Sequence, residues 1–217
     1  EKQYQVTIIN CVPPVTNDAG TVFLTMSDEQ LEQMTGLCDD AIAFGISLVT
    51  VHQVELAAQI NDYLKNLSDA PIVWGGVPVI SDPAFYLQHA DYVCTGEGEI
   101  FLHEFLKQIE QGLPLHHVRG MAYRTADGNM VTNPSIDKVN VNEIPLPLLD
   151  MDNIYLLNPS GLVSGKEHRD EVLQQAVKKY GFRVFQVRGC PFRCTFCANS
   201  TLAEANKGQY KLRGFTP

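Results

Sequence analysis

The stretch AIAFGISLVTVHQVELAAQINDYLKNLSDAPIVWGG (residues 41–76) contains a strand, a helix and a second strand in that order. The apolar run over residues 41–49 has no polar alternation, which is typical of a strand buried on both faces. Apolar residues then recur at helical spacing across residues 53–67, and a second apolar strand at residues 72–74 ends at two glycines. This order, with buried strands, predicts a parallel sheet.

The same alternation continues in both directions from this stretch. Ser27 and Gln30 have the spacing of a capping box, which predicts the start of a helix that reaches about Leu37. The remaining expected elements are a strand at residues 6–9, a short helix at 83–89, a strand at 92–94 and a helix at 100–111. We therefore expect an α/β fold, with a Rossmann-like domain over residues 1–118 whose parallel sheet is covered on both faces.

The second half of the chain is less regular. Asp127-Gly128 lies between β-prone flanks and predicts a hairpin over residues 121–132. Residues 133–165 are rich in Pro, Asn and Ser and are interpreted as a linker, followed by a helix at 167–180 and a strand at 182–188. The predicted regions after the first domain are thus a hairpin and linker region at 119–180 and a third region at 181–217.

Composition excludes several classes of protein. The chain has 217 residues and a net charge of −9, with 45% apolar and 19% charged residues, which is a globular composition and not that of a disordered chain. The acidic balance, without a run of basic residues, argues against nucleic-acid binding. The longest apolar stretch is about half of the ~20 residues that span a bilayer, and no signal peptide is recognisable. Three of the six cysteines are scattered and three fall within eight residues, which is not the arrangement of a disulfide framework. The cysteines therefore predict a reducing, cytoplasmic location.

Three of the six cysteines form the strongest signal in the sequence. Cys190, Cys194 and Cys197 have C-x3-C-x2-C spacing in a loop that directly follows a predicted strand. A short loop with these gaps can supply three thiolates to an iron–sulfur cluster, which leaves one of four irons without a protein ligand. Zinc is an alternative, but structural zinc sites take four ligands, and only one C-x2-C unit is present. The third interpretation is three buried structural cysteines.

This loop resembles that of the radical S-adenosylmethionine (SAM) enzymes, whose signature is C-x3-C-x-aromatic-C, with Phe196 as the aromatic residue. The resemblance implies that the three cysteines hold a 4Fe-4S cluster and that SAM chelates the open iron. Reductive cleavage of SAM then gives a 5′-deoxyadenosyl radical, with the electron supplied by a donor such as flavodoxin or ferredoxin. It also implies that Phe196 packs near the adenine of SAM, and that residues 181–217 begin a radical SAM (β/α) barrel, most of which this chain lacks.

Three loops after predicted strands are similar to the cobalamin-binding domain that precedes the radical domain in one subclass of these enzymes. The matching pieces are Gly-Ile-Ser-x-x-Thr at 45–50, Gly-Gly at 75–76 and Asp-Tyr-Val-x-x-Gly-Glu-Gly-Glu at 91–99. Ligands of open α/β sheets bind beyond the carboxyl ends of the strands. The resemblance implies that cobalamin contacts the following residues: Ser47, Leu48, Thr50, Gly75, Gly76, Val77, Gly96, Glu97 and Gly98.

The sequence departs from many cobalamin domains in two respects. None of its histidines has an aspartate two residues before it, so the Asp-x-His-x-x-Gly motif that supplies cobalt with a ligand is absent. We therefore expect base-off cobalamin without a histidine ligand, and His52 is interpreted as a surface residue at the start of a helix. The first strand–helix unit of such a domain is also expected upstream of Glu1. Because most of the radical SAM barrel is expected to be missing as well, the chain is interpreted as a fragment that is inactive by itself.

These features lead to three functional hypotheses. The first is a cobalamin-dependent radical SAM enzyme, with methyl transfer to an unactivated carbon of a small-molecule or peptide substrate as the leading reaction. The second is a radical SAM enzyme of another reaction type, such as ring formation or rearrangement, whose first domain only docks substrate. The third is a non-catalytic metal- or nucleotide-binding module. No catalytic residue is predicted in this stretch of sequence, and the substrate site is expected to lie outside it.

Overall fold

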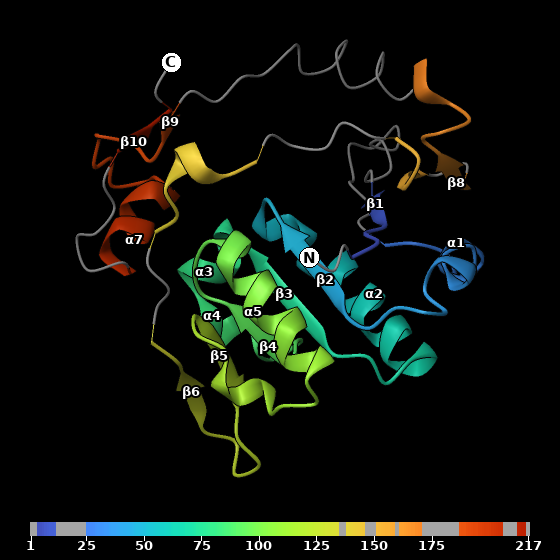
Figure 1. Cartoon of the computed structure of the whole chain (residues 1–217), viewed down its shortest axis with the longest axis horizontal. Helices are drawn as coiled ribbons and strands as arrows, with labels where there is room; N and C mark the ends of the chain where they lie inside the picture. Colours follow the sequence, from blue (N-terminus) through green and yellow to red (C-terminus); the bar gives the residue numbers. More distant parts are fainter. Residues whose placement is uncertain are drawn as a thin grey trace, which may run out of the picture. The chain divides into compact units, whose positions relative to one another are not determined.

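Five strands form one sheet in the order β2-β3-β4-β5-β6 (Figure 1). The computed structural model describes residues 4–11, 25–134, 138–145, 151–158, 161–170, 187–205 and 212–215. The strands of this sheet are β2 (Phe44–Leu48), β3 (Ile72–Gly76), β4 (Tyr92–Cys94), β5 (Met121–Arg124) and β6 (Met130–Thr132). The first three are parallel, as the apolar runs predict, whereas β5 and β6 are antiparallel. The hairpin expected around Asp127-Gly128 therefore extends the sheet and makes it mixed.

Helices cover both faces of this sheet. They are α2 (Val54–Leu67), α3 (Val77–Ser81), α4 (Pro83–Tyr86) and α5 (Gly98–Glu110), and short 3-10 turns lie at Val51–Gln53 (η2) and Leu115–His117 (η3). Successive residues of β3 point to opposite faces. Val73 packs with Phe101 and Phe105 of α5, whereas the indole N–H of Trp74 donates to Asn61 of α2 at 3.0 Å. β3 and β4 are thus largely buried on both sides, which explains their continuous apolar sequences. β2 is instead the edge strand of this sheet, and its Gly45 and Ser47 are exposed, so the expectation that the run at 41–49 is buried on both faces is wrong.

The chain divides into two compact units, residues 1–40 with 145–185 and residues 41–144 with 186–217. In the first unit, β1 (Ile8–Cys11) pairs in parallel with β7 (Ile154–Asn158), which pairs antiparallel with β8 (Gly161–Ser164). The strand expected at residues 6–9 therefore exists but belongs to a separate sheet. Two strands also lie within the stretch that was interpreted as a linker.

The first unit also contains a short helix, α1 (Asp28–Glu32), and a 3-10 turn, η1 (Thr35–Leu37). The capping box predicted at the start of this helix is confirmed. The backbone N–H of Ser27 donates to the Gln30 side chain at 2.9 Å, and the Gln30 N–H donates to the Ser27 hydroxyl at 3.3 Å. The expected helix to Leu37 is thus split, because the α-helix ends at Glu32 and a tighter turn follows.

The second unit also contains the cysteine-bearing segment. It comprises β9 (Val187–Arg188), α7 (Ala198–Ala205) and β10 (Arg213–Gly214), with η4 (Val141–Glu143) earlier in the chain. β9 pairs antiparallel with β10, and α7 packs against α3. Most of the helix expected at residues 167–180 and of the strand expected at 182–188 lies outside the described residues. A radical SAM barrel therefore remains a prediction from the sequence.

None of the helices in the described ranges combines the length and the apolar character that are needed to cross a membrane.

Candidate cofactor site

The carboxyl ends of the three parallel strands meet at one edge of the sheet. β2 ends at Leu48, opposite Gly76 at the end of β3, and β4 ends at Cys94 beside Gly75. The register therefore brings together the three glycine-containing pieces that the sequence analysis singled out. We call this place the carboxyl edge; residues 49–53 follow β2 there, α3 begins directly after β3 at Val77, and residues 95–97 follow β4.

Two adjacent glycines at this edge have different roles. Gly76 has φ +106°, and a β-carbon there would lie 2.0 Å from the carbonyl oxygen of Leu48. Glycine is thus required at this position by the close approach of β2 and β3. Gly75 is different, because the nearest atom to its added β-carbon would be Cys94 Cβ at 3.7 Å, and an added β-carbon at Gly96 would have no neighbour within 4 Å. Gly75 and Gly96 therefore leave room at the edge that larger residues would fill.

The loop after β2 is held by its own hydrogen bonds. The side-chain oxygen of Gln53 accepts the N–H groups of Val49 at 2.7 Å and Thr50 at 3.0 Å, and the Thr50 side chain caps the turn that follows. The side chain of Leu48 is buried in the core, so that only its backbone can contact a ligand, whereas Ser47 is exposed. His52 is exposed in η2, as the sequence analysis expected.

Apolar side chains line the carboxyl edge and face solvent. Val49 is 75% exposed, Val51 58% and Val77 41%. Val49 follows β2 directly, Val51 begins η2, and Val77 is the first residue of α3 directly after β3. Exposed apolar side chains grouped around one place commonly mark a binding surface. Exposed valines and two glycines with open space beside them make this edge accessible to a ligand.

The cysteine loop has a defined local structure. Gly189, with φ +98°, precedes Cys190 at the end of β9. The carbonyl of Cys194 accepts the Cys197 N–H at 3.1 Å and the Ser200 hydroxyl at 2.7 Å, so the second and third cysteines sit in a turn from which α7 begins. Because α7 packs against α3, which starts directly after Gly76, the loop belongs to the same unit as the carboxyl edge.

The donor set of this loop fits an iron–sulfur cluster. All six cysteines lie in the described part of the chain and none forms a disulfide. Cys194 is exposed, Cys190 and Cys197 are partly exposed, and the Phe196 ring beside them is 91% exposed. Three free, accessible thiols within eight residues are the ligands that such a cluster takes. As placed, these thiols do not converge on one point, since no three potential ligand side chains of the described residues are grouped as around a metal ion.

The other three cysteines lie in different surroundings. Burial raises the pKa of the Cys11 thiol and of the Cys94 thiol to about 11. Burial, followed by the negative charge of Asp39, also raises the pKa of Cys38. Raised pKa values keep these thiols protonated and therefore poor metal ligands. Cys38 and Cys94 are buried and Cys11 is half-buried, so these three act as small hydrophobic residues.

The two glutamates of the Gly-Glu-Gly-Glu segment contact arginines that flank the cysteine loop. Arg213 donates to both carboxylate oxygens of Glu97, and Arg188 donates to Glu99. Burial alone would raise the pKa of Glu97, but the hydrogen bonds from Arg213 and the Val139 N–H, with the nearby positive charges, outweigh it and hold this pKa below its usual value. Sequence reasoning did not find this contact, because the glutamates and Arg213 are more than 100 residues apart.

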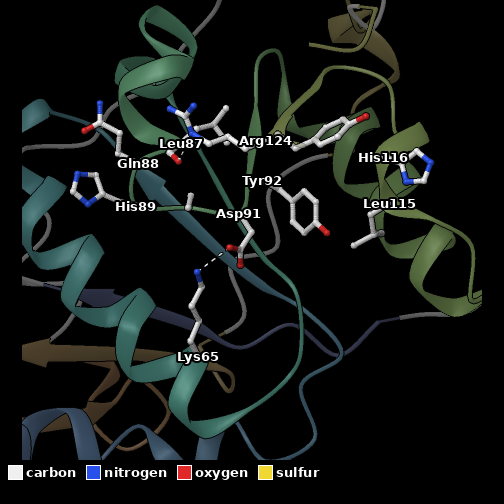
Figure 2. Close-up of a pocket in the computed structure, with 11 residues that line it drawn as sticks. Lys65, Leu87, Gln88, His89, Asp91, Tyr92, Leu115, His116 and Arg124 are labelled. Carbon is white, nitrogen blue, oxygen red and sulfur yellow. Dashed lines mark hydrogen bonds and ion pairs between the residues drawn. The ribbon is translucent and has the colours of Figure 1, made fainter. Parts of the chain in front are cut away.

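A separate pocket of about 510 Å³ opens at the opposite edge of the sheet, beside the first residue of β4 (Figure 2). Figure 2 shows that its charged side chains are engaged by the protein itself. Lys65 pairs with Asp91 at 2.8 Å, and the Arg124 guanidinium donates to the carbonyl oxygens of Leu87, Gly128 and Ala84. Only Asp91 and Tyr92, the first two residues of the third matching piece, line this pocket. The glycines of all three pieces lie elsewhere, so the carboxyl edge remains the candidate site.

The chain is similar to several known proteins at low identity. No family model matches the chain. It is 28% identical over 141 residues to an uncharacterized methyltransferase of Pyrococcus horikoshii, covering 63% of this chain and 27% of that protein. It is 25% identical over 198 residues to the anaerobic magnesium-protoporphyrin IX monomethyl ester cyclase of Rubrivivax gelatinosus, covering 86% of this chain and 31% of that protein. The chain thus spans less than a third of the length of these relatives.

Among solved structures, the chain is similar to the cobalamin-dependent S-adenosylmethionine radical enzyme OxsB, solved with aqua-cobalamin and S-adenosylmethionine bound. The TM-score is 0.56 at 25% identity, and the match covers 77% of this chain and 21% of that one. This likeness agrees with the mixed α/β fold and with the resemblance that the cysteine and glycine motifs indicated. In both sequence motifs and fold, the chain resembles the cobalamin-dependent radical SAM enzymes.

Proposed function

We propose that this chain belongs to a cobalamin-dependent radical SAM enzyme, and that its leading reaction is methyl transfer to an unactivated carbon. The observation that carries the proposal is the placement of two motifs in one compact unit. The cysteine loop continues directly into α7, the glycine edge continues directly into α3, and these two helices pack together. Cofactors held by the two motifs would therefore lie on the same side of the sheet.

The carboxyl edge is the proposed cobalamin site. Ser47 and Thr50 would contact the nucleotide tail, and Gly75 lets the ligand approach the backbone closely. The other proposed contacts come from the backbone of Leu48, Gly76, Val77, Gly96, Glu97 and Gly98. The exposed valines of the edge would cover one face of the corrin. When bound, cobalamin supplies a cobalt centre that can carry a methyl group, and the protein's part is to orient it.

The cysteine loop is the proposed site of a 4Fe-4S cluster with SAM. Cys190, Cys194 and Cys197 would be the thiolate ligands, and three ligands leave one iron open for SAM. Phe196, whose ring is exposed, would pack against the adenine of SAM. The cluster and SAM supply radical chemistry, whereas these residues bind and orient both groups.

Ring formation is the second candidate reaction, because one of the relatives is a cyclase. The two reactions share the cofactor sites proposed above and differ in the substrate site. They are separated by their product, since only methyl transfer moves the methyl carbon of SAM into the substrate.

The test is anaerobic reconstitution of the chain with iron and sulfide, followed by electron paramagnetic resonance after reduction. We expect iron and sulfide at one cluster per chain and a signal that changes when SAM is added, because SAM would chelate the open iron. A signal that is identical with and without SAM would contradict an open iron site. Tight binding of zinc in place of iron would contradict the radical SAM assignment itself.

A further inference from the structure

We infer that Glu97 and Glu99 are positioning residues that hold the cysteine loop, and that the Glu97 carboxylate does not bind cofactor. The sequence motif alone placed Glu97 among the cobalamin contacts. The structure instead directs the carboxylate of each glutamate to an arginine that flanks the loop. The inference rests on the proposed function only in taking this loop as the one that carries the cluster.

The two arginines mark the two ends of the loop. β9 and β10 pair antiparallel with Arg188 directly opposite Arg213, so this short ladder closes the segment 189–212, which contains all three cysteines of the motif. Arg188 lies two residues before Cys190. Contacts that hold these two arginines therefore fix both ends of the loop.

The contact with Glu97 is specific in its geometry. Nη1 of Arg213 donates to Oε2 of Glu97 at 3.0 Å, and Nη2 donates to Oε1. The same Nη1 donates to the Val139 carbonyl at 2.7 Å, and the Val139 N–H donates back to Oε2 of Glu97 at 3.2 Å. Two parallel charge-assisted hydrogen bonds orient an arginine more strictly than a single contact does.

Charge explains why both glutamates are needed. Two arginines directly opposite each other on paired strands repel. Arg213 is neutralised by Glu97, and Arg188 by Glu99, with Glu97 also 4.0 Å from Arg188. The side chains of Glu97 and Arg213 are each 19% exposed, so loss of one partner would leave a poorly solvated charge. The Arg188–Glu99 pair is about one-third exposed and is therefore weaker.

Helix capping does not account for the position of Glu97. Glu97 is the N-cap residue of α5, but its side chain accepts no hydrogen bond from the first turn of that helix. A carboxylate at a helix N-terminus is generally favourable. Here, however, both oxygens of this carboxylate turn to Arg213 and Val139. Because the same segment also carries Gly96 and Gly98, the contact ties the cysteine loop to the carboxyl edge.

The first test is hydrogen–deuterium exchange on the metal-free chain, which requires no cofactor. In Glu97→Gln, we expect amide exchange in residues 190–205 to accelerate about tenfold, with a smaller acceleration in the more exposed Glu99→Gln. Exchange in β3 should not change. The matched control is Glu104→Gln, which removes a different carboxylate–arginine pair from the same helix, with Arg119 as partner. This control should leave residues 190–205 unchanged.

The second test asks whether the contact positions the cluster. The exchanged pair Glu97→Arg with Arg213→Glu should restore slow exchange in part, and it should restore the electron paramagnetic resonance line shape that Glu97→Gln alone alters. Unchanged exchange at residues 190–205 in both single variants would overturn the inference. So would a loss of cobalamin affinity in Glu97→Gln with unchanged loop exchange. A wild-type chain that takes up no cluster would refute the proposed function, yet the exchange result would still decide whether the glutamates hold the loop.

Discussion

Replacing Gly76 with alanine tests whether β2 and β3 approach as closely as the carboxyl edge requires. Gly76 has φ +106° and ψ 170°, a region used almost only by glycine, where other residues lose about 1–3 kcal/mol. The added β-carbon would lie 2.0 Å from the Leu48 carbonyl oxygen and 2.9 Å from the Leu48 nitrogen. Because these atoms are backbone, relief requires the strands to separate, and overpacking of this kind costs about 1–3 kcal/mol. We expect Gly76→Ala to lower the free energy of unfolding by about 2–6 kcal/mol.

Two matched variants separate the causes of this loss. Gly112 has φ +62° and nothing within 4 Å of an added β-carbon, so Gly112→Ala should lose only about 1–2 kcal/mol from its backbone conformation. Gly75→Ala meets only an ordinary contact at 3.7 Å and should fold with nearly unchanged stability. Urea unfolding followed by the fluorescence of Trp74, the single and fully buried tryptophan, measures all three variants. A Gly76→Ala variant as stable as Gly112→Ala would refute the close approach.

Three further predictions concern a ligand, a buried hydrogen bond and pH. Cys194→Ala should abolish iron uptake on anaerobic reconstitution, because a methyl group cannot replace a thiolate, whereas Cys38→Ala should retain it. Asn61→Leu removes the buried acceptor of the Trp74 indole N–H and should lower the free energy of unfolding by about 1–3 kcal/mol in urea titrations. The pKa of Glu97 is lowered in the folded protein, so the ionised carboxylate stabilises the fold. This contribution is fully present above the ordinary pKa of about 4.5. This stabilisation should disappear as pH falls through the lowered pKa, measured as the wild-type minus Glu97→Gln difference in the free energy of unfolding.

Each of these predictions can fail in a recognisable way. Iron at the wild-type level in Cys194→Ala would remove that thiol from the ligand set. The exposed Asn66 on the same helix serves as the control for Asn61, and equal effects of Asn61→Leu and Asn66→Leu would show that the buried hydrogen bond contributes nothing. A difference between wild type and Glu97→Gln that stays constant from pH 7 to pH 3 would show that the carboxylate is not held as an anion by its arginine.

Local patterns predicted the elements that are determined locally. The apolar runs of β2, β3 and β4, the periodicity of α2 and α5, and the Ser27 capping box all appear in the structure. The short helix α3 was not predicted, because Val77–Ser81 is too brief for a periodic pattern and contains a proline. β7 and β8 were interpreted as part of a linker, since prolines and asparagines surround them. β7 pairs with the distant β1, and β8 pairs only with β7, so neither strand is determined by its local sequence.

The candidate site was predictable where one short motif carries its chemistry. The cysteine spacing and the glycines at strand ends pointed to the loop and to the carboxyl edge. Side-chain partners between distant segments were not predictable, because Glu97 and Arg213 are separated by 116 residues and neither forms part of a pattern that includes the other. The different roles of Gly75 and Gly76 were not predictable from the sequence either. Only the register of β2 against β3 shows that Gly76, and not Gly75, lies against a backbone oxygen.

The measurement that tests the central claim most directly is an anaerobic cobalamin titration of the protein with its cluster reconstituted, followed by visible absorption. We predict saturation at one cobalamin per chain with a base-off spectrum and no histidine ligand, because the chain lacks the Asp-x-His-x-x-Gly motif and its His52 is an exposed turn residue. Absence of binding, with the iron–sulfur absorption intact, would contradict the assignment of the carboxyl edge to cobalamin and leave a radical SAM enzyme whose first domain has another role.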